Sequence, residues 1–166
     1  MMGPAELADR VRQRFPEAID ARGEATLVVS PDELLSTLEY LRDEPDLRFG
    51  FLADLTATDW PGLEPRFWVV YHLLSQEHGH RLRVKVGLPA DAPHVPSVTP
   101  MFPGANWPER EVYDFFGVIF DGHPDLRRIQ MPEDWVGHPL RKDEGMGGVN
   151  TAYKGAFIPP PDQRGV

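Results

Sequence analysis

Acidic, basic and histidine side chains crowd into one short stretch, residues 105–129, which reads ANWPEREVYDFFGVIFDGHPDLRRI. Such side chains could transfer protons, bind a metal or form salt bridges with another protein. Glu109 and Glu111 could act as an acid and a base, but two residues apart on a helix they point in different directions. Glu109, His123 and Asp125 could bind the metal of a free-standing hydrolase, although no helical spacing of ligands supports that site.

Histidines elsewhere offer weaker candidates. His78 and His80 flank a glycine in a predicted turn, where an exposed pair is far more often solvated than metal-bound. His123 and His138 each precede a proline, and a His-Pro step favours an extended bend of the chain. The chain contains no phosphate-binding glycine loop and no nucleophile elbow.

The charged stretch itself predicts a helix followed by a turn. Asn106 is the expected cap with Glu109 as its reciprocal partner, and Gly117 suits the end of the helix. Four apolar residues have the spacing of one buried helix face: Val112, Phe115, Phe116 and Ile119. On the opposite face we expect exposed charges, with Arg110 and Asp114 as neighbours four residues apart.

The turn that follows carries Asp125, Arg127 and Arg128, which could pair locally or with a partner. One interpretation is a solvated helix face beside a salt-bridged turn. The other is a protein-contact surface, because arginine and aromatic groups are typical of interfaces. The residue types alone leave both open.

Composition narrows the class of protein. The 166 residues include no cysteine, which excludes disulfides, thiolate nucleophiles and cysteine-ligated iron–sulfur clusters in this chain. The formal net charge of −9 argues against nucleic acid or an anionic membrane as the main partner. No apolar run approaches a membrane-spanning length, and the first residues lack the apolar core of a signal peptide.

The segments before the charged stretch predict an α+β fold, with a mixed, mostly antiparallel sheet covered by helices on one face. Helices are expected over residues 5–15 and after Ser30, which with Glu33 forms a capping-box pattern. The second helix is expected to bury Leu34, Leu35, Leu38 and Leu41. Strands are expected in ATLVVS, RFGFLADLTATDW, RFWVVYHLLS and RLRVKVGL.

Strand patterns also predict which residues face the core. In RFGFLADLTATDW, alternate residues Phe49, Phe51, Ala53, Leu55 and Ala57 should share one face. RFWVVYHLLS is apolar on both faces and should be an interior strand. We divide the chain into a globular part (1–90), a helix-and-turn part packed on it and on partners (91–143), and an extended proline-rich tail (144–166).

The charged stretch and the segment PEDWVGHPLRKD after it resemble the C subunit, of the 30 kDa type, of the proton-pumping NADH–quinone oxidoreductase, respiratory complex I. The matching residues are Glu109, Arg110, Glu111, Asp114, Phe115, Phe116, His123, Asp125, Leu126 and Arg127, then Gly137, His138, Pro139, Arg141, Lys142 and Asp143. The resemblance covers about residues 25–145. Gln130 departs from it, because an aliphatic residue is usual there.

The resemblance implies a cofactor-free bracing subunit in the hydrophilic arm, peripheral on the cytoplasmic face of the cell membrane. It implies contacts chiefly with the D subunit, the large subunit that shapes the quinone site together with the B subunit. Contacts with the B subunit and the ferredoxin-like subunit are also implied, while FMN and Fe-S clusters belong to partner subunits. We therefore expect no catalytic, cofactor or metal residue in this chain. The expected contact residues are Glu109, Arg110, Glu111, Asp114, His123, Asp125, Arg127, Arg128, His138, Arg141, Lys142, Tyr153 and Phe157.

Two alternatives remain. Related subunits occur in membrane-bound hydrogenase-type oxidoreductases, and the complete Gly-His-Pro-Leu-Arg-Lys-Asp ending favours complex I over them. The metal hydrolase is the remote alternative. The tail, with Tyr153, Phe157 and three consecutive prolines, is expected to be mobile in the free chain and to lie extended across neighbouring subunits.

Overall fold

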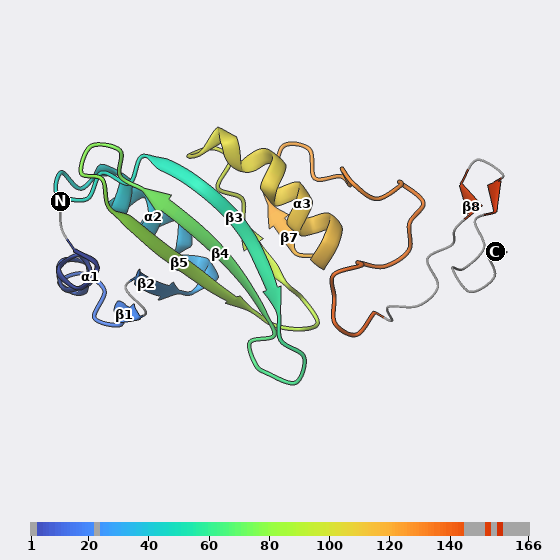
Figure 1. Ribbon diagram of the computed structural model, residues 1–166, viewed down its shortest axis with the longest axis horizontal. Coiled ribbons are helices and arrows are strands. Elements are labelled where there is room, and N and C mark those ends of the chain that lie inside the picture. The colour runs from blue at the N-terminus through green and yellow to red at the C-terminus, as the bar shows by residue number, and fades with distance from the viewer. Residues whose placement is uncertain (1–2, 22–23, 145–151, 154–155, 158–166) are drawn as a thin grey trace, which may run out of the picture.

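The computed structural model describes residues 3–21, 24–144, 152–153 and 156–157. A five-stranded sheet dominates it, in the order β1-β2-β5-β4-β3 (Figure 1). The strands are β1 (Ile19–Ala21), β2 (Glu24–Val29), β3 (Phe51–Asp59), β4 (Phe67–Leu74) and β5 (Arg81–Leu88). Only β2 and β5 run parallel and the other neighbours are antiparallel, so the predicted mixed α+β fold is confirmed.

Three α-helices pack on one face of this sheet: α1 (Pro4–Arg12), α2 (Leu34–Asp43) and α3 (Asn106–Phe116). One apolar core contains alternate residues of the strands, such as Val69 of β4 and Val84 of β5, together with residues of all three helices. Figure 1 shows α2 behind the strands and α3 beside β3. Each fully buried leucine or phenylalanine contributes about 1.5–3 kcal/mol through removal of its surface from water.

Smaller elements connect these layers. Two 3-10 turns, η1 (Pro31–Glu33) and η2 (Pro103–Ala105), lead into α2 and α3. Two short strands, β6 (His94–Pro96) and β7 (Ile119–Asp121), pair in parallel on either side of α3 in the sequence. β8 (Ala152–Tyr153) and β9 (Ala156–Phe157) form a two-stranded antiparallel pair in the tail. The rest of the expected extended tail lies outside the described residues.

The edge strand β3 departs from the predicted alternation. Its pairing with β4 shifts between Leu52 and Asp54, which is the signature of a β-bulge. The extra residue reverses the faces of the strand before it, so Leu55 and Ala57 are buried as predicted whereas Phe51 is 45% exposed. The prediction that Phe51 and Ala53 face the core is therefore wrong.

Helix starts also differ from the predictions. Neither Ser30 nor Asn106 caps a helix with its side chain, because a 3-10 turn precedes each α-helix and satisfies its first donors. The hydroxyl of Ser30 donates to Glu33 instead. In α2, Leu35 is exposed and Thr37 takes the expected place in the buried stripe.

Candidate functional site

Helix α3 carries an unusual load of buried charge. Glu109 and Asp114 are 0% exposed and Arg110 is 7% exposed. The expectation that these groups are displayed on a solvated helix face is wrong. Arg110 and Asp114 lie on the face opposite Val112 and Phe116, and loops that follow the helix fold back over them. Glu109 lies on the same face as Val112 and Phe116 and is buried in the core.

Asp114 organises the turn that follows β7. Its carboxylate accepts hydrogen bonds from the backbone N–H groups of Ile129, Gln130 and Met131, at 3.1, 2.8 and 2.9 Å. Arg128 donates to the same carboxylate at 2.7 Å. Burial alone would raise the pKa of Asp114, but these donors together lower it below its usual value. Asp114 is thus an ionised residue that holds residues 128–131 against α3.

The end of α3 is closed by residues from far along the chain. Gly117 adopts the left-handed conformation, φ 72°, and ends the helix as predicted. Arg128 and His138 donate to the carbonyl of Asp114, and the N–H of Leu140 donates to that of Phe115. These donors satisfy carbonyls that a helix leaves unpaired at its C-terminus.

Arg141 completes this closure. Its Nε donates to the carbonyl oxygen of Phe116 at 2.6 Å. Arg128, which bonds Asp114, also donates from Nη2 to the carbonyl oxygen of Gly137 at 2.7 Å. Cationic side chains at a helix C-terminus also interact favourably with the helix dipole. The structure therefore brings the two predicted motifs, residues 105–129 and 132–143, together at one end of α3.

Arg110 does not pair with Asp114 as predicted. Its guanidinium donates to the carbonyls of Arg127 and Arg128, at 3.1 and 3.3 Å, and lies over the ring of Trp107 with 5.0 Å to the ring centre. Asp114 is engaged by Arg128 instead. Arg110 thus secures the turn from inside the chain.

Glu109 sits in the core with few polar partners. Its carboxylate accepts from Ser97 Oγ and from the N–H of Val98, each at 2.7 Å. Burial raises the pKa of Glu109 to about 7, although the two donors act in the opposite direction. Tyr71, from β4, has a buried hydroxyl that bonds none of the described residues, and its pKa is raised by burial and by the charge of Glu109.

His123 lies beside this carboxylate, with 3.9 Å between Nε2 and Glu109 Oε2. The ring donates from Nε2 to the carbonyl of Asn106 at 3.2 Å and accepts the N–H of Asp125 at Nδ1, at 3.0 Å. The carboxylate of Asp125 turns away to Arg127, at 2.9 Å. The three candidate ligands of the hydrolase alternative therefore do not converge, and residues 3–21 and 24–144 contain no cluster of three or more metal-ligating side chains.

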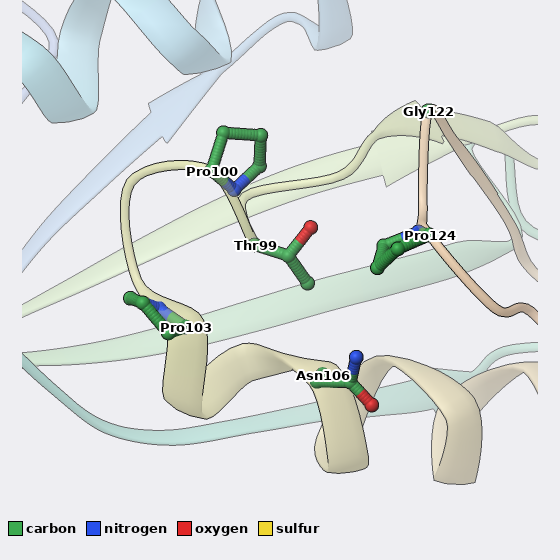
Figure 2. A pocket seen from close by; sticks show the side chains of 6 residues that line it. All are labelled: Thr99, Pro100, Pro103, Asn106, Gly122 and Pro124. Atoms are coloured by element: carbon green, nitrogen blue, oxygen red, sulfur yellow. The ribbon is translucent and has the colours of Figure 1, made fainter.

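A shallow pocket of about 360 Å³ opens next to the Glu109 cluster. Figure 2 shows its lining, which consists of Thr99, Pro100, Pro103, Asn106, Gly122 and Pro124. Thr99 and Asn106 connect it to the interior, because Thr99 bonds Ser97 and the carbonyl of Asn106 accepts from His123.

A second ion-pair cluster ties the loop between β3 and β4 to the segment after α3. Arg66 binds the buried carboxylate of Asp59 through two hydrogen bonds, of 2.7 and 2.9 Å, and also contacts Asp143 at 2.8 Å. The N–H of Lys142 donates to Asp59 at 2.7 Å. Arg66 is the main cause that lowers the pKa of Asp59.

Sequence reasoning missed Asp59, Arg66, Ser97 and Tyr71. The burial of Asp59 could have been predicted, because it continues the inward-facing series Leu55, Ala57 in β3. A buried carboxylate needs a partner. The role of Ser97 could not have been predicted, since nothing in its local sequence indicates a contact with Glu109, twelve residues away.

The two histidines of the β4–β5 turn are not the solvated pair that was expected. His80 is 4% exposed and its Nε2 contacts the carbonyl oxygen of Leu47 at 3.0 Å, while His78 contacts that of Pro45 at 2.9 Å. The rings stack 5.4 Å apart, and burial lowers the pKa of His80. Both side chains serve to pack the loop after α2.

The remaining predicted contact residues differ in exposure. Asp125, Arg127 and Lys142 are exposed, and Glu111 is half-buried with a hydrogen bond from Gln130. Tyr153 and Phe157 lie on β8 and β9, and their side chains fall outside the described residues. Several large apolar side chains are also exposed in α3, in the β3–β4 loop and in the segment after β7, namely Trp60, Leu63, Trp107, Val136 and Leu140. None of the helices that the structure describes could cross a bilayer.

Comparison with known proteins places these features in a family. Residues 27–150 match the family model described as the 30 kDa subunit of respiratory-chain NADH dehydrogenase. A relative from Nocardioides sp., named as the C subunit of NADH-quinone oxidoreductase, is 49% identical over 150 residues, covering 90% of this chain and 60% of the relative. Relatives of the same name from Saccharopolyspora erythraea and Roseiflexus sp. are 52% and 48% identical. The matches cover 86% and 90% of this chain, and 58% and 88% of those relatives. The chain thus spans about three fifths of the first two relatives' length.

Two solved structures share the fold. The trypsin-resistant fragment (1–134) of Nqo5 is 34% identical with a TM-score of 0.63, and the match covers 71% of this chain and 98% of the fragment. A chain of the membrane-bound sulfane sulfur reductase, an archaeal respiratory membrane complex, is 30% identical with a TM-score of 0.67. That match covers 86% of this chain and 85% of the other.

Proposed function

Since the chain belongs to the family of the 30 kDa subunit of respiratory-chain NADH dehydrogenase, we propose that it is a structural subunit in the hydrophilic arm of a proton-translocating NADH:quinone oxidoreductase. The observation that carries the proposal is the family match over residues 27–150, which includes all of α3 and the loops that close it. The complex would pass electrons from NADH through FMN and Fe-S clusters to quinone. This chain would hold no cofactor and would stay peripheral, on the cytoplasmic face of the cell membrane.

In this role α3 and its loops serve as a rigid contact surface. The shape of this part of the chain is fixed, through the bonds described above, by the buried Glu109, Arg110 and Asp114 and the partly buried His123, Arg128, His138 and Arg141. Rigid elements lose little conformational entropy on binding, which favours affinity. Fixing the shape is thus the role we assign to the buried members of the motif.

The exposed residues would then make the contacts. Trp107 and Val136 are 63% and 91% exposed, and large apolar groups in such positions are typical of binding sites. We propose that they bind chiefly the D subunit, the large subunit that shapes the quinone site. The B subunit and the ferredoxin-like subunit would be further partners. The charged rim would be formed by Glu111, Asp125, Arg127 and Lys142, with Tyr153 and Phe157 of the tail as further contacts.

The test is purification of the tagged chain from membranes of its own organism, with identification of the proteins that accompany it. Trp107→Ser should weaken recovery of the large quinone-site subunit and lower NADH:quinone activity in the membranes, because an interface anchor is lost. Leu35→Ser is the matched control, since Leu35 is also an exposed apolar residue but lies on α2. Full recovery of the large quinone-site subunit with Trp107→Ser would show that this surface is not part of the interface.

The likeness to the sulfane sulfur reductase chain supports a second candidate, in which the same kind of subunit serves a hydrogenase-type respiratory complex. Its identity of 30% is lower than the 48–52% of the relatives named for NADH-quinone oxidoreductase. The purification separates the two candidates. A flavin-containing NADH-oxidising partner supports complex I, and its absence together with a hydrogenase-like large subunit supports the alternative.

A further inference from the structure

Glu109 helps to fix the shape of the contact surface, but its surroundings are unlike those of the other buried acids. Asp59 and Asp114 each face an arginine at 2.7 Å. In residues 3–21 and 24–144, neither a lysine nor an arginine forms an ion pair with Glu109. Its two donors, Ser97 Oγ and the N–H of Val98, are neutral. A buried carboxyl without a countercharge favours its protonated form.

The groups that the structure places beside Glu109 are neutral. Tyr71 of β4 contributes an unpaired, buried hydroxyl. His123, after β7, donates one ring nitrogen to the carbonyl of Asn106 and accepts a backbone N–H at the other, which is the bonding pattern of the neutral imidazole. Ser97, after β6, adds a hydroxyl. No neighbour in the described part of the chain therefore offers a fixed positive charge to hold Glu109 ionised.

A row of hydroxyls connects this carboxyl to the pocket. Ser97 Oγ lies 2.7 Å from Glu109 Oε2 and 2.8 Å from Thr99 Oγ1. Thr99 lines the pocket (Figure 2). Either hydroxyl of the Ser97–Thr99 pair can be the donor, and Ser97 can accept from Glu109 once that carboxyl is protonated.

We propose that Glu109 is a proton-binding site inside the protein, which exchanges its proton with the solvent of the pocket through the hydroxyls of Ser97 and Thr99. When the carboxylate is ionised, Thr99 donates to Ser97 and Ser97 donates to Glu109. A proton arriving at Thr99 Oγ1 displaces the Thr99 proton to Ser97 and the Ser97 proton to Glu109 Oε2. Each hydroxyl gains one proton and loses one, and the protonated carboxyl then donates to Ser97.

The pH range of proton binding follows from the environment. Burial raises the pKa of Glu109 to about 7 in the folded chain, against 4.5 as its ordinary value. Between these values the folded chain binds one more proton than the unfolded chain, so stability falls as pH rises and the loss is complete above about pH 7. The pH dependence that arises from Asp59 and Asp114 has the opposite sign. Their pKa values are lowered in the folded chain, so the stability that they contribute is lost as pH falls through those values.

The first experiment compares the full chain with its Glu109→Gln variant by urea unfolding from pH 5 to pH 8. Glutamine reproduces the protonated acid, with an oxygen for Val98 and an N–H for Ser97. The unfolding constant of the wild type, divided by that of the variant, should rise on the order of 100-fold across this range. Glu111→Gln is the matched control, and its unfolding constant should change with pH as that of the wild type does. A ratio that stays flat overturns the proposal.

The infrared spectrum of the wild type tests the same site without any substitution, should Glu109→Gln fail to fold. The carbonyl band of a protonated carboxyl should persist at pH 6, where exposed acids are ionised, and disappear as pH rises beyond about 7. Its absence at pH 6 overturns the proposal.

The route is tested by Thr99→Val, which keeps the shape of the side chain and removes the hydroxyl. After a rapid pH jump, this variant should lose the fast phase in which the carboxyl band appears, although the carboxyl still titrates. Thr56→Val, on the exposed side of β3, should behave as the wild type. Equal rates in Thr99→Val and the wild type overturn the hydroxyl route. The proposal does not depend on which respiratory complex contains the chain.

Discussion

At the scale of single residues, three buried carboxylates show how differently one chemical group can be used. Asp59 and Asp114 are paired with arginines and backbone N–H groups and are held ionised, whereas the donors that the structure describes for Glu109 are neutral. An isolated buried charge costs far more than a paired one. The pairing of each acid, rather than its burial, therefore decides whether it acts as a fixed anion or as a titrating group.

Asp114→Asn tests the fixed anion. The amide cannot accept from all four donors of Asp114 and leaves the partly buried Arg128 without an opposite charge, so the free energy of unfolding should fall by roughly 3–5 kcal/mol. Urea unfolding of the full chain at pH 7 measures it. Asp125→Asn serves as the control, because its ion pair with Arg127 is exposed and should be worth less than about 1 kcal/mol. Equal losses in both variants would contradict the role given to Asp114.

At the scale of elements, the central strands and the C-terminal end of α3 could be predicted from the sequence. The segment RLRVKVGL forms β5, in which the alternate residues Leu82, Val84, Val86 and Leu88 are buried, and α3 ends at Gly117 as predicted. The period of side chains in a strand and the conformational freedom of glycine are local properties, which the sequence carries directly.

The burial of charge on α3 could not be predicted in the same way. Val112 and Phe116 face the core as expected, but Ile119 belongs to β7 and not to the helix. The polar face is buried because residues 127–131 and 138–141 fold over it, and their partners lie 14 to 25 positions away. Local periodicity cannot indicate such distant contacts. The bulge in β3 is a similar case, since its effect on Phe51 depends on pairing with β4.

Gly117→Ala tests the closure of α3. Gly117 and Gly122 have φ angles of 72° and 82°, so alanine at either position costs about 1–2 kcal/mol of backbone strain. Only at Gly117 would the new methyl group also collide with Arg141 and His138, whereas Gly122 faces open space. Thermal unfolding should therefore show a clearly larger loss for Gly117→Ala than for Gly122→Ala. Equal losses would mean that the closing side chains move away freely.

At the scale of the whole molecule, Arg66 joins two parts that are distant in sequence. It bonds Asp59 in β3 and Asp143 beyond α3, which lie 7 and 77 positions away. The exposed Trp60 and Leu63 belong to the same loop as Arg66, and Leu140 precedes the segment that Arg66 holds. The ion pairs of Arg66 thus fix the position of these exposed apolar groups relative to one another.

Arg66→Lys should loosen this connection, because an ammonium cannot bind two carboxylates in the planar, forked manner of a guanidinium. We expect faster amide exchange at Lys142, whose N–H bonds Asp59, while the N–H of Leu140, bonded to Phe115, keeps its protection. Arg42→Lys is the control, since Arg42 also bonds an aspartate, Asp43, through two nitrogens, but on the exposed side of α2. Unchanged exchange at Lys142 would show that Arg66 is dispensable for this connection.

The closure of α3 by later residues sets an order of events during synthesis. A ribosome releases the chain from the N-terminus, so Asp114 emerges before Ile129, Gln130 and Met131, whose N–H groups satisfy its carboxylate. Until those residues arrive, the carboxylate must remain in water, because burying it unpaired is too costly. The sheet and α2 can assemble while translation continues, but the polar side of α3 closes only after residues 127–131 and 138–141 have been made. A pause of the ribosome between Gly117 and Arg128 would leave that side open to chaperones.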